Sequence, residues 1–304
     1  MNYGIEVPVF SCQSLSSELY SPVMNPLTSY LSKVIAAFVV LAALAFFTAP
    51  SAGAQSAPQP QKSSTITAPA AAPAAPLSTS AELTIAAQRV AQMEQTLADW
   101  PNLAKYREAN AALASPAAPE KRVVFMGDSI TEGWTTLDPQ FFTAHPGYID
   151  RGISGQTTPQ MLVRFRQDVI ALRTAVVVIL AGTNDIAGNT GPTTIEAIED
   201  NLQSMAELAR ASGIRVVLSS VLPVFDYAWR PGLQPVPKIA ALNSWMKDYC
   251  AKEGCVYLDY YSAMADERKG LPSALSRDGV HPNKAGFALM EPLAENAIAQ
   301  ALAH

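Results

Sequence analysis

Apolar runs rich in β-branched residues alternate with stretches of helical periodicity along the second half of the chain. The runs cover 122–126, 175–181, 214–218 and 255–258, with a weaker one over 147–153. Helical patterns lie between and after them, near 159–172, 193–212, 237–253 and 284–302. Continuous apolarity is typical of strands buried on both faces of a parallel sheet. The alternation therefore predicts a three-layer α/β/α domain built on a parallel sheet of about five strands.

The N-terminal part of the chain has a different pattern. Lys33 is followed by an apolar run over 34–47 and by an Ala-Gly-Ala sequence at 52–54. These features describe a secretory signal peptide, whereas a spanning helix usually needs a longer run of about 20 residues. We expect a signal peptide and leader over 1–54, a secreted or periplasmic protein, and no stable membrane span after cleavage. An uncleaved N-terminal anchor is the alternative, and Met24 could be the true start.

Composition divides the remaining chain. Residues 55–80 are rich in Ala, Pro, Ser and Gln, which predicts a disordered linker because such a segment buries little apolar surface. Helical patterns over 81–99 and 102–114 predict an N-terminal helical extension over 81–120. The α/β domain is then expected to occupy 121–304.

Charge and cysteine content limit the function classes. The net charge is −5 and no basic run occurs, so a nucleic-acid partner is not expected. No histidine or cysteine motif of a metal site is present, and we expect neither metal nor cofactor. Export would place Cys250 and Cys255 where a disulfide can persist, although two free thiols are an equal alternative.

Polar loops containing glycine follow the predicted strands. Asp128 and Ser129 follow the first run, Gly155 follows the weak run, and Asn184 and Asp185 follow the run over 175–181. Ligands of open parallel sheets bind beyond the carboxyl ends of the strands. These loops are therefore predicted to form one site at that edge.

Four sequence blocks resemble those of the GDSL/SGNH hydrolase family. They read FMGDSITEG, GISGQTT, LAGTNDI and, near the C-terminus, DGVHPN, with isoleucine in place of the leucine of the family name. The resemblance covers about residues 121–302 and implies a flavodoxin-like SGNH hydrolase fold. It also implies a Ser129 nucleophile, a His281 base with Asp278 as its acid, and oxyanion donors at Ser129, Gly155 and Asn184.

The residues themselves favour the same catalytic group. A serine hydroxyl needs a base to remove its proton, and histidine titrates in the required range. Of the three histidines, His304 is terminal and His145 has no partner motif, whereas His281 follows Asp278 by three positions. Asp278 can then hold the imidazole and stabilise its charged form.

The developing oxyanion requires donors that already point at it. Gly155 offers an unobstructed backbone N–H, Asn184 offers a side-chain amide, and Ser129 offers a further N–H. Asp128 and Asp185 are interpreted as carboxylates that brace their loops.

These observations predict a serine esterase that hydrolyses short acyl or acetyl esters through an acyl-enzyme. An acetylesterase acting on carbohydrate O-acetyl groups is the alternative, and a non-catalytic carbohydrate-binding module is a further one. The expected partner is a small-molecule or carbohydrate ester, and the oligomeric state is left open. Phe225, Tyr227 and Trp229 either line the pocket or pack their loop on the domain.

Overall fold

The computed structural model describes residues 79–116 and 121–303. The expected leader over 1–54 and most of the expected linker over 55–80 lie outside the described residues. All described residues belong to one compact unit, Ala75–His304. Among them, no helix combines the length and the apolarity that crossing a membrane requires.

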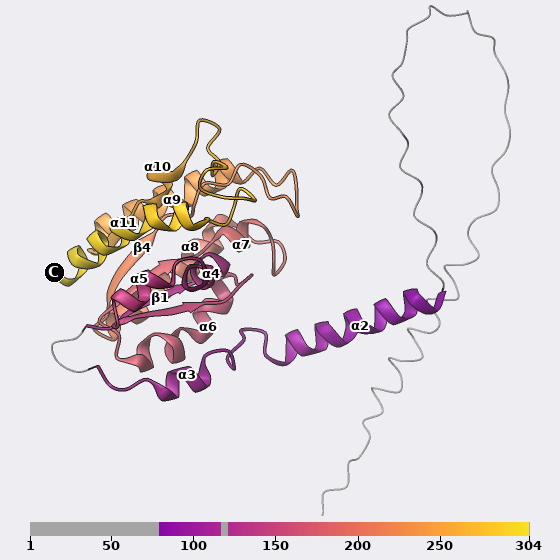
Figure 1. Ribbon diagram of the computed structural model, residues 1–304, viewed down its shortest axis with the longest axis horizontal. Helices are drawn as coiled ribbons and strands as arrows, with labels where there is room; N and C mark the ends of the chain where they lie inside the picture. The colour runs from indigo at the N-terminus through magenta and orange to yellow at the C-terminus, as the bar shows by residue number, and fades with distance from the viewer. Residues whose placement is uncertain (1–78, 117–120, 304) are drawn as a thin grey trace, which may run out of the picture. The chain divides into compact units, whose positions relative to one another are not determined.

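A parallel sheet of five strands forms the centre of the domain, in the order β2-β1-β3-β4-β5. Figure 1 shows strands β1 and β4 among the helices of the domain. The strands are β1 (Val123–Gly127), β2 (Tyr148–Gly152), β3 (Val176–Leu180), β4 (Arg215–Ser219) and β5 (Val256–Leu258). This order is that of flavodoxin-like folds, in which the strand order reverses beside β1. The fold class predicted from the sequence is confirmed.

Helices follow and flank the strands. They are α2 (Thr79–Ala98), α3 (Arg107–Ala112), α4 (Ser129–Leu137), α5 (Pro139–Ala144), α6 (Thr158–Asp168), the 3₁₀ helix η1 (Ile170–Leu172), α7 (Thr183–Ile186), α8 (Ile195–Ala211), α9 (Pro235–Glu253), α10 (Tyr260–Met264) and α11 (Lys284–Ala303). The long helices agree with the periodic segments. The short helices α4, α5, α7 and α10 were not predicted, because so few residues carry no readable period.

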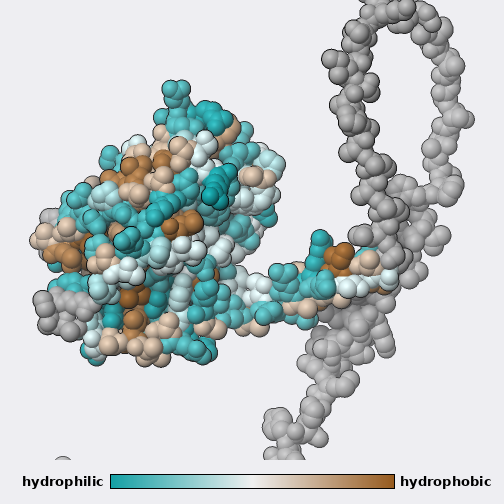
Figure 2. Space-filling model, viewed as in Figure 1, coloured by the Kyte–Doolittle hydropathy of each residue, from teal (hydrophilic) through white to brown (hydrophobic). Residues whose placement is uncertain are grey.

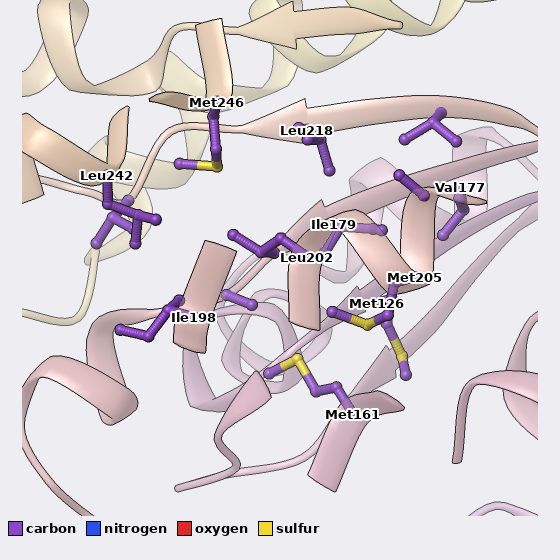
Figure 3. Packing of buried hydrophobic residues seen from close by; sticks show 14 of the residues in the cluster. Met126, Met161, Val177, Ile179, Ile198, Leu202, Met205, Leu218, Leu242 and Met246 are labelled. Atoms are coloured by element: carbon purple, nitrogen blue, oxygen red, sulfur yellow. The ribbon is translucent and has the colours of Figure 1, made fainter. Parts of the chain in front are cut away.

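Each face of the sheet packs against its own set of helices. On one face, Met126 of β1 and Leu218 of β4 belong to a buried cluster with side chains of α6, α8 and α9 (Figure 3). On the other face, Phe125 belongs to a cluster with α4, α5, α10 and α11. Here the Trp134 ring stacks on the Phe141 ring with centroids 4.8 Å apart. Burial on both faces explains the continuous apolarity of the strands.

The register of the strands aligns the ends that carry the polar loops. Gly127 is paired with Gly152 of β2 and with Leu180 of β3. A Cβ atom on Gly152 would lie 2.1 Å from the Glu132 backbone nitrogen. Glycine is therefore required where α4 crosses closely over β2.

Cys250 at the end of α9 and Cys255 before β5 are joined by a disulfide. Of the two alternatives that the sequence left open, the structure therefore contains the bonded one.

The segment after α2 is attached to the α/β domain by hydrogen bonds. Gln156 Nε2 donates to the Pro101 carbonyl oxygen at 2.7 Å, and Gln160 Nε2 donates to that of Trp100 at 2.7 Å. Asn110 Oδ1 accepts from Arg151 Nε at 2.8 Å. Part of the expected extension over 81–120 thus supports the loop that follows β2.

Candidate active site

The structure brings Ser129, His281 and Asp278 together at the carboxyl end of β1. Ser129 is the first residue of α4, and its Oγ lies 2.9 Å from His281 Nε2. His281 Nδ1 lies 2.6 Å from Asp278 Oδ2. The chain positions of these residues are far apart, so the contact between Ser129 and His281 depends on the whole fold.

A tight turn before α11 holds the acid against the histidine. Asp278 Oδ1 accepts the backbone N–H groups of Val280 at 2.9 Å and His281 at 2.8 Å. Partial burial opposes ionisation of Asp278, but hydrogen bonds from the His281 backbone and ring and from the Val280 backbone lower its pKa to about 2. Asp278 is therefore a charged acceptor at neutral pH.

The charged acceptor determines which ring nitrogen of His281 can act as a base. Asp278 accepts a hydrogen bond from His281 Nδ1, so the ring proton lies on Nδ1. The lone pair of Nε2 is then directed at the Ser129 hydroxyl. Ser129 can then donate its proton to Nε2 as its oxygen attacks.

Two backbone N–H groups at this edge are free to donate. Gly155 has a φ of +77°, a conformation that glycine adopts without strain, and no hydrogen bond among the described residues uses its N–H. Ser129 begins α4, so its own N–H has no partner within the helix.

The Asn184 side chain is held in one orientation by its neighbours. Its Nδ2 donates to the Gln156 carbonyl oxygen at 3.0 Å, and its Oδ1 accepts from Asn189 Nδ2 at 2.8 Å. Asn189 Nδ2 also lies 3.3 Å from the Gly155 carbonyl oxygen. One N–H of Asn184 therefore remains for a ligand. The sequence analysis missed Asn189, whose only signal is its position five residues after Asn184.

Glu132, also missed, links the first two loops of the site. Its Oε2 accepts the Ser154 backbone N–H at 2.7 Å, and its Oε1 pairs with Lys105 Nζ at 2.7 Å. Glu132 lies one turn after Ser129 on α4. That spacing was the signal that could have identified it as a brace for the turn at Gly155.

The buried Arg164 of α6 is a third missed residue. Its Nη2 donates to the Gly127 carbonyl oxygen at 3.0 Å and its Nε to Gln156 Oε1 at 2.5 Å. An ion pair with Asp168, at 3.0 Å, compensates the buried charge. Arg164 thereby fixes the end of β1 relative to the loop after β2.

Asp128 and Asp185 make the contacts of loop-bracing carboxylates. Asp128 Oδ1 accepts the Ile130 N–H at 2.9 Å and caps α4. Asp185 Oδ1 accepts the Thr158 hydroxyl at 2.6 Å, and both its oxygens lie 3.0 Å from the Thr158 nitrogen. Burial raises the pKa of both carboxyls, that of Asp128 to about 7. Asp128 Oδ2 has no hydrogen-bond partner among the described residues.

The free energy of unfolding should therefore fall as pH rises from about 4 to about 7, since the unfolded chain releases the Asp128 proton before the folded protein does. Between about pH 4.5 and 8, Asp128→Asn should make this fall in the free energy of unfolding smaller by about 3 kcal/mol. Urea unfolding at several pH values measures it. Burial also raises the pKa of Asp150 to about 7, so the contribution of Asp150 to the fall in the free energy of unfolding should remain in Asp128→Asn. Asp248→Asn on the exposed side of α9 is the control, and an equal effect of both variants would contradict the prediction.

The three aromatic residues of the loop after β4 differ in burial. Tyr227 is fully buried, and its hydroxyl donates to the Thr183 carbonyl oxygen at 2.9 Å, which braces α7 beside Asn184. Phe225 and Trp229 are exposed. The Trp229 ring lies beside the His281 ring, with centroids 6.4 Å apart.

Known families and proteins share sequence and fold with this chain. The sequence profile of the GDSL-like Lipase/Acylhydrolase family matches residues 125–289. Esterase TesA of Pseudomonas aeruginosa is 27% identical over 182 residues, which are 56% of this chain and 84% of that protein. The uncharacterized lipoprotein YqeF of Bacillus subtilis is 33% identical over 120 residues, which are 34% of this chain and only about half, 49%, of that protein.

A solved structure is more similar still. A GDSL-like lipase from Bacteroides thetaiotaomicron is 48% identical with a TM-score of 0.64, and the match covers 66% of this chain and 98% of that one. The matched range includes Ser129, Gly155, Asn184 and His281 and extends over more than half of the sequence. The chain therefore belongs to the GDSL-like lipase/acylhydrolase family.

Proposed function

We propose that this protein is a serine esterase that hydrolyses carboxylic esters of short acyl groups through an acyl-enzyme. The observation that carries the proposal is the hydrogen-bonded series Ser129 Oγ, His281 and Asp278, with distances of 2.9 Å and 2.6 Å. This arrangement has the parts that nucleophilic acyl transfer needs: a nucleophile, a base and a group that orients the base.

The first half of the reaction forms the acyl-enzyme. Ser129 Oγ attacks the ester carbonyl carbon while His281 Nε2 takes the hydroxyl proton. The carbonyl oxygen becomes an oxyanion that receives the N–H groups of Ser129 and Gly155 and the free amide N–H of Asn184. The intermediate collapses, and the alcohol leaves with the proton from His281.

The second half regenerates the enzyme. Water attacks the acyl carbon as His281 takes one of its protons, and a second oxyanion forms at the same donors. Collapse of this intermediate releases the carboxylic acid and returns the proton to Ser129 Oγ.

Surface character supports short rather than long acyl groups. On the face shown in Figure 2, hydrophobic residues of the described domain form scattered patches between hydrophilic ones. Long-chain substrates usually require a broad apolar surface. The exposed Trp229 ring beside His281 favours a second candidate, an acetylesterase acting on carbohydrate O-acetyl groups, since a flat ring can cover a sugar face.

Hydrolysis of p-nitrophenyl acetate tests the esterase, with longer p-nitrophenyl esters and acetylated sugars as the comparison panel. We expect kcat/KM to fall as the acyl chain lengthens. A preference for acetylated sugars over simple acetates would favour the second candidate. Saccharide binding without hydrolysis of any ester would instead indicate a non-catalytic module.

We also propose that the protein acts outside the cytoplasm. The signal-like pattern over 1–54 supports this, as do the Cys250–Cys255 disulfide, which persists in oxidising compartments, and the lipoprotein among its relatives. N-terminal sequencing of the exported protein should begin at Gln55. Recovery of the full-length chain from the cytoplasm would contradict it.

A further inference from the structure

A cavity of about 670 Å³ lies between the loop after β3 and the segment that leads into α9. Residues 185–189, 191–195 and Ile198 line one part of the cavity, and Arg230, Leu233 and Lys238 line the other. The proposed reaction assigns no role to this cavity.

Two cationic side chains line the cavity with unused hydrogen-bonding capacity. Lys238, half-buried in the first turn of α9, forms no ion pair or hydrogen bond with any residue in the described part of the chain. Arg230 Nη1 donates to the carbonyl oxygens of Ala187 at 2.9 Å and Gly188 at 2.7 Å. These two bonds hold the guanidinium at the cavity wall while its Nε and Nη2 have no partner among the described residues.

No carboxylate in the lining of the cavity is placed to neutralise these cations. Asp185 is the one acidic side chain in its lining, and it is buried with both oxygens turned toward Thr158. The cavity is therefore locally positive in a chain whose net charge is −5. A cation pair in a concave site attracts anions and raises their local concentration.

Residues in both parts of the cavity lining neighbour residues that contact the catalytic group. Asn189 lines the cavity and donates to Asn184 Oδ1 at 2.8 Å. Arg230 on the other wall follows Trp229, whose ring lies beside that of His281. Through Asn189, the cavity therefore adjoins the predicted oxyanion donor Asn184.

We propose that this cavity is a subsite for an anionic group of the ester substrate, a carboxylate or a phosphate, bound by Lys238 and Arg230. The protein then acts preferentially on esters of acidic molecules. This inference rests on the proposed esterase function and extends it to a substrate class. Arg230 provides a planar pair of donors for the anion and Lys238 a mobile point charge.

The test compares esters that differ in one charge. On the alcohol side, 4-acetoxybenzoate is compared with its neutral methyl ester, and 4-acetoxyphenyl phosphate provides the phosphate arm. On the acyl side, p-nitrophenyl hydrogen adipate is compared with p-nitrophenyl hexanoate. Lys238→Met removes the charge and keeps the apolar stem. Lys247→Met, on the exposed side of the same helix, removes an equal charge away from the cavity.

We expect Lys238→Met to lower the ratio of kcat/KM for the anionic ester to that for its neutral partner about tenfold, as for the loss of one charge-assisted contact. Lys238→Glu should lower the ratio further, and Lys247→Met should leave it unchanged. The pair of esters whose ratio falls shows whether the anionic group bound in the cavity belongs to the acyl or the alcohol part of the substrate. The anionic ester with the higher kcat/KM shows whether the cavity prefers a carboxylate or a phosphate. An unchanged ratio in every pair, or equal effects of the two methionine variants, would overturn the subsite.

Failure of the esterase itself is distinguishable from failure of the subsite. If the wild type hydrolyses none of these esters, the proposed function is wrong. Calorimetric binding of 4-acetoxybenzoate and its methyl ester to Ser129→Ala then still reports on the cavity. Tighter binding of the anion that is lost in Ser129→Ala/Lys238→Met supports the subsite, and equal binding of both esters rejects it.

Discussion

Ser129→Ala is expected to lower kcat for p-nitrophenyl acetate by at least about 10⁴-fold, because the methyl group cannot form the acyl-enzyme. Ser129 Oγ lies 2.9 Å from His281 Nε2. Among the described residues, no other hydroxyl forms a hydrogen bond with His281. Residual hydrolysis would come from substrate binding and the oxyanion donors alone.

Labelling with a covalent probe tests independently whether Ser129 is the nucleophile. A fluorophosphonate should label the wild-type protein, and mass spectrometry should find the adduct on Ser129. Ser244→Ala, which removes an exposed hydroxyl from α9, is the matched control and should label normally. Labelling that persists in Ser129→Ala would show that another residue is the nucleophile.

The sequence predicted the parts of the fold and site that rest on local pattern. Doubly buried strands appear as uninterrupted apolar runs, and the run that became β3 matches its strand closely. Because parallel strands end at one edge, the loops carrying Ser129, Gly155 and Asn184 could be expected to meet there. The D-x-x-H spacing likewise places Asp278 and His281 in one turn.

The supporting contacts could not be predicted because they join segments that are distant in sequence. Glu132 reaches the Ser154 N–H from another loop, and Arg164 reaches the end of β1 from α6. The one local signal for Glu132 is its spacing from Ser129, and nothing in the local sequence distinguishes Arg164 from a solvated helix position. The cavity at Lys238 was missed for the same reason, since its two walls come from chain segments separated by β4.

His281→Ala should also lower kcat by at least about 10⁴-fold, whereas Asp278→Asn should be less severe by about one to two orders of magnitude. In the proposed mechanism the imidazole takes and returns the proton, and the carboxylate only orients the ring and stabilises its charged form. In Asp278→Asn, an amide oxygen can still accept the backbone N–H groups of Val280 and His281, which preserves the turn. Steady-state kinetics measure kcat for the two variants. Circular dichroism checks that both variants are folded. Equal losses in both would make Asp278 as necessary as the base.

The pH profile separates the acid from other carboxylates. Wild-type kcat/KM should rise with pH, since a general base accepts a proton only in its unprotonated form. The pKa of Asp278 is about 2, so this carboxylate stays charged throughout the rise. In Asp278→Asn a neutral amide replaces the carboxylate charge beside the base, and the rise should move to lower pH. Burial raises the pKa of Asp128 to about 7, so Asp128→Asn is the control variant, and it should keep the rise in place. If Asp278→Asn keeps both the wild-type rate and the wild-type profile, Asp278 is not the third member, and Asp128 and Asp185 are the next positions to replace.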